Sequence, residues 1–184
     1  MRNVRSKQGQ QPSVMFSGGL KPVEELDRVL LAYTPDKQDA ICKNEPDCFF
    51  GDHPTLATLN RDYDADAGVA WLIPQITDCV MFTNNRGILD DNQTEALARL
   101  IASEYYYLKV SELMFFFRRF KLGRYKQIYG NFSPMAITLS VREFLIERND
   151  AYFKHVSKLE EEKRNKDAGK GISYQEYLSL KKKR

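Results

Sequence analysis

The sequence has few of the residues on which most catalytic sites are built. Its 184 residues include only two histidines, His53 and His155, and three cysteines, Cys42, Cys48 and Cys79. A Ser/His/Asp or Cys/His catalytic set would need one of the two histidines, and neither lies in a recognisable motif. No glycine-rich phosphate-binding loop with its lysine is present. We therefore expect a protein that is not an enzyme and that holds no cofactor.

Long apolar segments are also missing. The densest apolar run, residues 69–82, is interrupted by Pro74 and Asp78 and is shorter than the roughly 20 residues that a bilayer-spanning helix needs. The basic, glutamine-rich segment 1–11 is followed by no apolar stretch of the kind found in signal peptides. An odd and sparse set of cysteines suits a reducing compartment. We expect a cytoplasmic protein without disulfides and without membrane contact.

Two patterns faintly resemble metal sites, but their spacing is wrong. Cys42, Cys48 and His53 are separated by five and four residues, whereas structural zinc ligands usually come in pairs two to four residues apart. The aspartates that alternate in residues 62–66 lack the glycine position and the final glutamate of a calcium loop. We expect buried thiols and helix caps here, and no metal.

Charge is distributed unevenly along the chain. Residues 22–95 carry a net charge of −10 and residues 96–184 a net charge of +9, within a total of +3. Such asymmetry indicates either a surface that faces a polyanion or two faces that complement each other inside one fold. The sequence leaves both interpretations open.

Hydrophobic spacing predicts a mainly α protein, with a single compact helical domain of about five to seven helices. We expect a flexible basic N-terminal arm over residues 1–20, the helical domain over 21–153, and a charged helical extension with a basic tail over 154–184. The first helix is expected to start at Pro22, and short helical segments are expected over 36–42 and 54–60. A longer helix, capped by Asp64 or Asp66, should run to about residue 81, and the next should start at Asp90 or Asp91. A helix over about 110–122 should be ended by a left-handed Gly123, and another should start at Ser133-Pro134.

The segment Arg118 to Asn131, which we call the basic junction, is the strongest candidate for a binding site. Cations and aromatic rings alternate in it, and residues 118–126 contain no acidic group. Cationic groups neutralise phosphates and flat rings stack on unpaired bases, so the combination suits single-stranded nucleic acid. The candidate residues are Arg118, Arg119, Lys121, Arg124, Tyr125, Lys126 and Tyr129.

The same residues have a structural explanation. Cations near a helix C-terminus are favoured by the helix dipole, and tyrosines beside a glycine turn often pack against the core. The basic residues of the arm and of the tail 181–184 would add only non-specific contacts with a polyanion.

Several segments carry a resemblance to known sequences: 69–73 (VAWLI), 100–113 (LIASEYYYLKVSEL), 116–125 (FFRRFKLGRY), Tyr129-Gly130 and 144–148 (FLIER). Through them the chain resembles an uncharacterised family of small helical proteins from conjugative elements and prophages of Bacteroides-type bacteria. Its relatives often have Gly-Arg-Tyr-Gly in the loop, where this chain has Lys126 after Tyr125. The resemblance implies the biology of mobile elements, such as replication or transfer, and supplies no catalytic residue.

Our first hypothesis is a non-enzymatic accessory protein of a mobile element. It would bind single- or double-stranded DNA, or a DNA-processing complex of replication or conjugation proteins, through the basic junction. The alternative is a protein–protein adaptor that binds no nucleic acid and uses the Phe115, Phe116 and Phe120 surface together with the acidic half. An enzyme ranks third.

Overall fold

Two helices that are apolar on most of their faces form the centre of the fold. In α7 (Val110–Lys121) every residue from Val110 to Phe117 is buried, and in α5 (Ala67–Phe82) the buried residues likewise cover more than one face. A helix that is hydrophobic all round has to be enclosed by other elements. The remaining helices are arranged around this pair.

The computed structural model describes residues 20–82, 89–125, 134–168, 174–175 and 178. Within these ranges the regular structure is helical, apart from one isolated bridge between Thr55 and Lys109. The other elements are α1 (Val23–Ala32), the short 3₁₀ helix η1 (Pro35–Lys37), α2 (Gln38–Ile41), α3 (Glu45–Phe50), α4 (Leu56–Asp62), α6 (Asp91–Glu104) and α8 (Pro134–Ala168).

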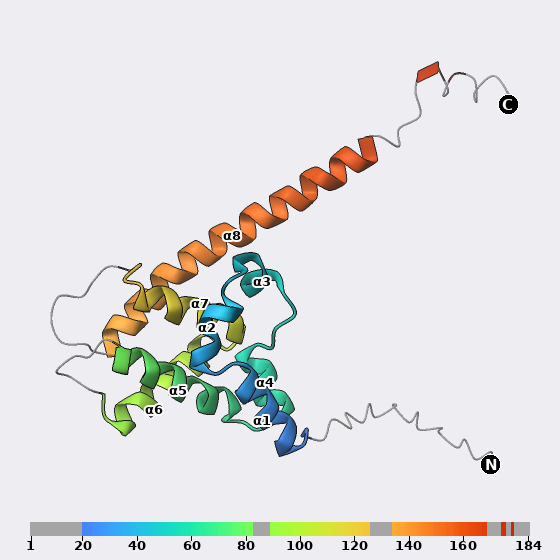
Figure 1. Cartoon of the computed structure of the whole chain (residues 1–184). Coiled ribbons are helices and arrows are strands. Elements are labelled where there is room, and N and C mark those ends of the chain that lie inside the picture. The colour runs from blue at the N-terminus through green and yellow to red at the C-terminus, as the bar shows by residue number, and fades with distance from the viewer. Residues whose placement is uncertain (1–19, 83–88, 126–133, 169–173, 176–177, 179–184) are drawn as a thin grey trace, which may run out of the picture.

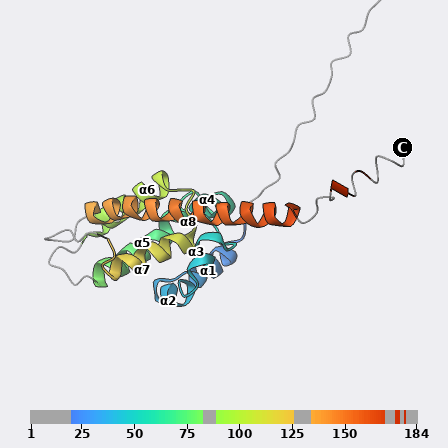
Figure 2. The same cartoon turned by 90° about the horizontal axis from the view of Figure 1, so that it is seen from above.

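Helices α1 and α2 lie on one side of the central pair, and α6 and α8 lie on the other (Figure 2). Helices α4 and α6 pack against α5, while α2 and α3 pack against α7. Buried polar groups tie the N-terminal segment to α5: the indole N–H of Trp71 and the side-chain amide of Gln75 both donate to the carbonyl oxygen of Tyr33, at 3.0 and 2.7 Å. The position of the N-terminal segment on α5 is thus fixed by hydrogen bonds as well as by apolar packing.

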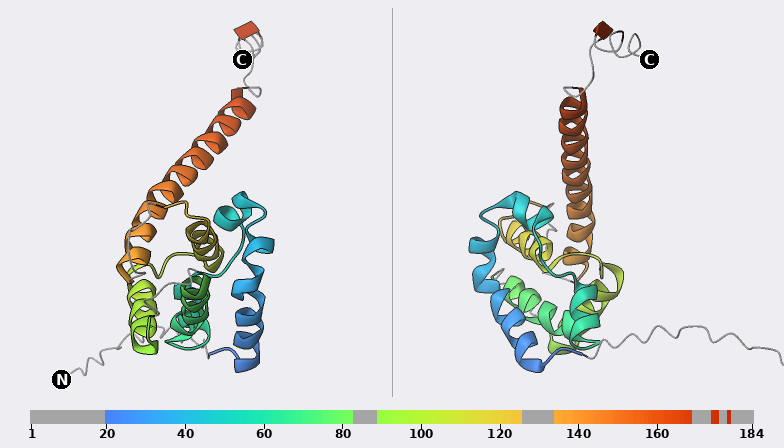
Figure 3. Two further views of the ribbon diagram at one scale, coloured as in Figure 1. Left: turned by 60° about the vertical axis from the view of Figure 1, so that its left-hand side comes forward. Right: turned by 90° about the vertical axis from the view of Figure 1, so that its right-hand side faces the viewer.

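Helix α8 is much longer than the body it packs against. At about 1.5 Å per residue its 35 residues extend for roughly 50 Å. Its N-terminal half packs on α6 and α7, and its C-terminal part projects away from the other helices (Figures 1 and 3). From Glu160 to Asp167 every side chain is exposed.

The structure confirms the predicted mainly α fold and a compact helical domain. It also settles the start of α6, where Asp90 is the N-cap and forms a capping box with Gln93. Pro74 lies inside α5. Helix α3 was not expected from the sequence, and the boundary expected at residue 154 lies within α8. The arm over residues 1–19 and the basic tail lie outside the described residues.

None of the helices in the described ranges is both long and apolar enough to cross a bilayer.

Helix α7 ends at Lys121 and is followed by Gly123, which has the left-handed conformation that the sequence predicts. Its φ of 68° lies in the left-handed region, which costs any residue with a Cβ atom about 1 kcal/mol or more. We expect Gly123→Ala to lower the free energy of unfolding by about 1 kcal/mol, and Gly123→Asn to lower it less because asparagine tolerates this region. Urea denaturation followed by the fluorescence of the single tryptophan, Trp71, would measure both. Equal losses for the two variants would contradict the conformational explanation.

Candidate functional site

The cations at the end of α7 are bound to carboxylates of other helices. Arg118, Arg119 and Lys121 each form an ion pair, and Arg119 forms two. The pairs are Arg118 with Asp39 at 2.6 Å, Arg119 with Glu45 at 3.2 Å and with Glu147, and Lys121 with Asp78 at 2.7 Å. These three side chains already neutralise acidic groups within the fold.

The aromatic part of the basic junction is partly in the core. Tyr125 is only 5% exposed, and its ring lies 5.5 Å from that of Phe116. Burial raises the pKa of the Tyr125 hydroxyl above its ordinary value. Arg119 also lies over the ring of Phe115, 4.3 Å from its centroid. A buried ring cannot stack on a nucleic-acid base without leaving the core.

Arg124 is the exposed cation that remains at the described end of the basic junction. It follows the left-handed turn at Gly123 and has no ion pair with any residue that the structure describes. Lys126 and Tyr129 lie outside the described residues. Binding of nucleic acid by the seven residues stays a prediction, and Arg124 is the member whose position suits it best.

The ion pairs also explain part of the charge asymmetry. Asp39, Glu45 and Asp78 belong to the acidic half of the sequence, and the cations that they bind belong to the basic half. A further pair of this kind joins Arg99 to Asp66 at 2.9 Å. Of the two interpretations that the sequence left open, these contacts favour halves that complement each other inside one fold.

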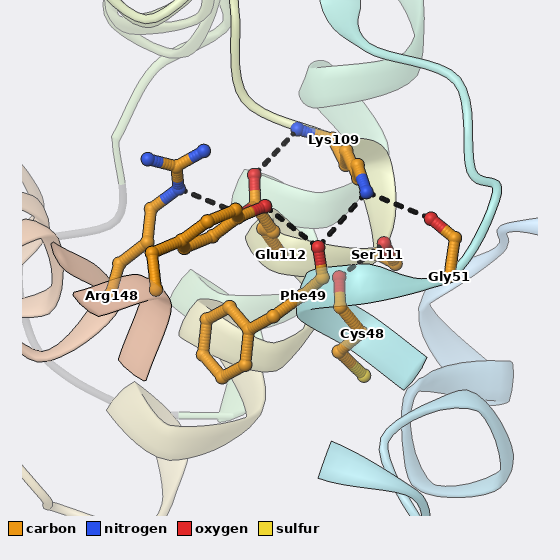
Figure 4. A network of polar contacts seen from close by, with 8 residues as sticks. Cys48, Phe49, Gly51, Lys109, Ser111, Glu112 and Arg148 are labelled. Atoms are coloured by element: carbon orange, nitrogen blue, oxygen red, sulfur yellow. Dashed lines mark hydrogen bonds and ion pairs between the residues drawn. The ribbon is translucent and has the colours of Figure 1, made fainter. Parts of the chain in front are cut away.

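The most complete polar arrangement surrounds Glu112, whose side chain is fully buried (Figure 4). Its carboxylate accepts hydrogen bonds from the guanidinium of Arg148 at 2.7 Å and from the backbone N–H of Lys109 at 2.9 Å. The hydroxyl of Tyr152 lies 3.0 Å from the same carboxylate. We call these four residues the Glu112 network.

The Glu112 network also holds the C-terminal end of α3. The ammonium group of Lys109 donates to the carbonyl oxygens of Phe49 at 2.9 Å and Gly51 at 2.8 Å, and the Tyr152 hydroxyl lies 2.7 Å from the first of these (Figure 4). Burial and the Glu112 carboxylate raise the pKa of Tyr152 to about 12. Since a helix end leaves carbonyl groups without partners, these donors stabilise α3 where it ends.

Three donors surround a carboxylate that has no exposed surface, so a substrate could reach Glu112 only by displacing them. Acid–base catalysis requires a group within hydrogen-bonding distance of the reacting atom. The geometry is that of a structural network that joins α3, α7 and α8.

The cysteines and His53 of the zinc-like pattern lie in environments that do not form a metal site. All three cysteines are free and buried, and burial raises the pKa of Cys79 to about 12. His53 is hydrogen-bonded to the hydroxyl of Tyr33 at 3.0 Å and contacts Asp47 at 3.2 Å. In the described part of the chain, no three or more His, Cys, Asp or Glu side chains gather as metal ligands would.

A shallow groove of about 630 Å³ lies between α3 and α8. Phe50 and His155 stack at its border, with ring centroids 3.9 Å apart. Two of the charged side chains that line it are bound to neighbours, Asp47 to His53 and Lys154 to Asp150. The groove therefore presents few free polar groups that would orient a small ligand.

The side of α8 that faces away from the body is unusually apolar. The residues of α8 that face the core are Ile137, Val141 and Phe144, all fully buried. The outer face of α8, as we call it, consists of four residues on the opposite side of the helix: Met135 (66% exposed), Leu139 (44%), Ile146 (72%) and Phe153 (72%). No binding role was predicted for this surface, although the spacing of seven residues from Leu139 to Ile146 to Phe153 is a visible signal in the sequence.

A family model described as a family of unknown function, DUF6633, matches residues 90–184, which is just over half of the chain. The chain belongs to this family. No curated protein and no solved structure matches the chain. The match confirms the expectation of an uncharacterised family, whereas the mobile-element origin of the relatives stays a prediction.

The DUF6633 match spans α6, α7 and α8. It therefore contains all four residues of the Glu112 network and the whole outer face of α8. The carbonyl groups of Phe49 and Gly51 come from outside the match. The two most distinctive features of this structure thus lie on the DUF6633 segment.

The Glu112 network should be important for stability. Removing one partner of a buried ion pair leaves an uncompensated charge, so we expect Glu112→Ala to lower the free energy of unfolding by about 3–5 kcal/mol. Urea denaturation followed by Trp71 fluorescence would measure the loss. Glu95→Ala is the matched control, because Glu95 pairs with Arg99 at the surface and such pairs contribute less than about 1 kcal/mol. A loss for Glu112→Ala no greater than for the control would refute the assignment.

Proposed function

We propose that this DUF6633 protein is a non-enzymatic adaptor that binds other protein chains through the outer face of α8. The observation that supports the proposal most is the exposure of Ile146 and Phe153, each 72% accessible, on a helix that extends beyond the body. Contiguous exposed apolar surface on a folded protein marks sites of interaction, because leaving it in water is unfavourable.

The chemistry of this face suits a protein partner. Aromatic anchors on a rigid element carry a large share of the energy in protein interfaces, and Phe153 is such an anchor. A helix presents its residues at fixed spacing, so a partner helix or groove can match them without reordering the backbone. Docking there breaks no ion pair or hydrogen bond that involves Ile146 or Phe153.

Nucleic-acid binding through the basic junction is our second candidate. The specific observation in its favour is Arg124, exposed at the turn after α7, beside a chain segment that continues to Lys126. The pairing of Arg118, Arg119 and Lys121 reduces the cationic charge available for phosphates. This candidate therefore relies on fewer residues than the sequence suggests.

The resemblance to proteins of conjugative elements and prophages supplies the biological context that we propose for either function. In that context the protein acts in the cytoplasm as an accessory to replication or transfer. An adaptor would join components of a DNA-processing complex, and a nucleic-acid-binding protein would contact the DNA itself.

Site-specific photocrosslinking tests the adaptor proposal. A benzoylphenylalanine in place of Phe153 preserves an aromatic side chain, and we expect it to crosslink the chain to another polypeptide under native conditions. The matched control carries the same group in place of Leu31, which is 63% exposed on α1. Crosslinks at position 153 and not at position 31 support the proposal. Absence of crosslinks at 153, or equal yields at both positions, would remove its basis.

A salt-dependent oligonucleotide titration tests the second candidate. We expect Arg124→Glu to weaken binding of a fluorescent single-stranded DNA by about tenfold and to lower the salt dependence, since one phosphate contact is lost and one repulsion gained. Arg28→Glu, an exposed change on α1, is the control. Arg119→Glu is unsuitable because it would also break the pairs with Glu45 and Glu147. Salt-independent binding, or binding that Arg124→Glu leaves unchanged, would contradict the candidate.

A further inference from the structure

The outer face of α8 belongs to a repeat of seven residues. Leu139, Ile146 and Phe153 recur at one position, and Glu160 continues it. The residues three positions after each of these form the second position of the repeat: Arg142, Asn149, Val156 and Lys163. Two such positions per seven residues form the contact seam of a coiled coil. In α8 Arg142, Ile146, Phe153, Val156 and Glu160 are all exposed.

We propose that the outer face of α8 binds a second copy of this chain, with the two α8 helices antiparallel about a two-fold axis near residue 151. This inference rests on the proposed protein-binding role of the same face. In an antiparallel pair, the first position of the repeat on one helix packs in a layer with the second position on the other. The layers are Leu139 with Lys163, Arg142 with Glu160, Ile146 with Val156, and Asn149 with Phe153 of the second copy, each formed twice.

Charge complementarity supports this register. Arg142 and Glu160 are both exposed, and within the described residues neither forms an ion pair. The antiparallel register places each opposite its counterpart in the second copy, so the dimer gains two ion pairs of opposite charge. Sliding the helices by one repeat in one direction would put Arg142 opposite Phe153. Sliding them in the other direction would put Arg142 opposite Asp167 and Glu160 opposite Asn149, so that Glu160 would lose its partner. Self-complementarity of this kind is what a two-fold interface requires.

The apolar residues agree with the same register. Ile146 meets Val156 of the second copy in two symmetric layers on either side of the axis. The layer of Leu139 with Lys163 is closed by the aliphatic part of the lysine, whose ammonium group stays in water. Asn149 lies opposite Phe153. It is one of four polar residues among the eight seam positions of each helix, and polar residues in a coiled-coil seam help to fix register at a cost in stability.

The antiparallel dimer would also bring the projecting C-terminal part of α8 into contact with the second copy. The segment beyond Val156 extends away from its own body (Figures 1 and 3). In the antiparallel pair it lies along residues 139–146 of the second copy, where the outer face is exposed. From Leu139 to Lys163 the seam is about 36 Å long at 1.5 Å per residue. Each copy covers the surface that the other exposes.

Charge reversal tests both the partner and the register, using the full chain. Arg142→Glu places two glutamate pairs in the dimer, and Glu160→Arg places two arginine pairs. We expect each variant to self-associate about tenfold more weakly than the wild-type chain in sedimentation velocity. An equimolar mixture of the two variants restores opposite charges at both pairs, so its association should return to the wild-type level.

The control is Arg28→Glu, which reverses an exposed charge on α1 and should leave self-association unchanged. Circular dichroism and urea midpoints would verify that each variant is folded. A wild-type chain that stays monomeric would overturn the inference, and so would a mixture that associates no better than its components. If the chain is monomeric while position 153 still crosslinks to a different polypeptide, self-pairing fails and the adaptor proposal stands. If neither occurs, both fail.

Discussion

A carboxylate with no exposed surface has to be neutralised where it lies, and in this protein that carboxylate belongs to Glu112. The desolvation of a charge in the interior costs several kcal/mol, which only close partners can offset. Arg148 and Tyr152 supply these partners from α8, and the Lys109 backbone supplies one from the start of α7. Any rotation or sliding of α8 would separate the charges. The Glu112 network therefore fixes how α8 sits on the body.

The orientation of α8 decides which of its residues meet water. With Arg148 and Tyr152 directed toward Glu112, the helical period directs Phe144 into the core and leaves Ile146 and Phe153 on the opposite side. The outer face is thus a consequence of the buried charge, because α8 cannot turn to cover these residues.

Periodicity and capping signals predicted the helical fold, a helix start at Asp90 or Asp91 and the left-handed Gly123, because each depends on residues near one another in sequence. The partners of the basic junction did not follow from sequence. Residues 118–126 contain no acidic group, and the carboxylates that neutralise them, such as Asp39, come from distant helices. Helix α3 was missed because its six residues are too few for periodicity, and its end is held by contacts with α7 and α8.

The two candidate binding surfaces differ in what binding would cost. At the end of α7 a phosphate would have to compete with carboxylates that already lie 2.5–3.2 Å from Arg118, Arg119 and Lys121. Breaking such a pair leaves a carboxylate beside the incoming anion, so much of the attraction is offset by repulsion. At the outer face of α8, a partner displaces only water from apolar surface, which is favourable. The fold pairs the cations of α7 with carboxylates and leaves the apolar outer face of α8 exposed. This difference favours a protein partner over nucleic acid.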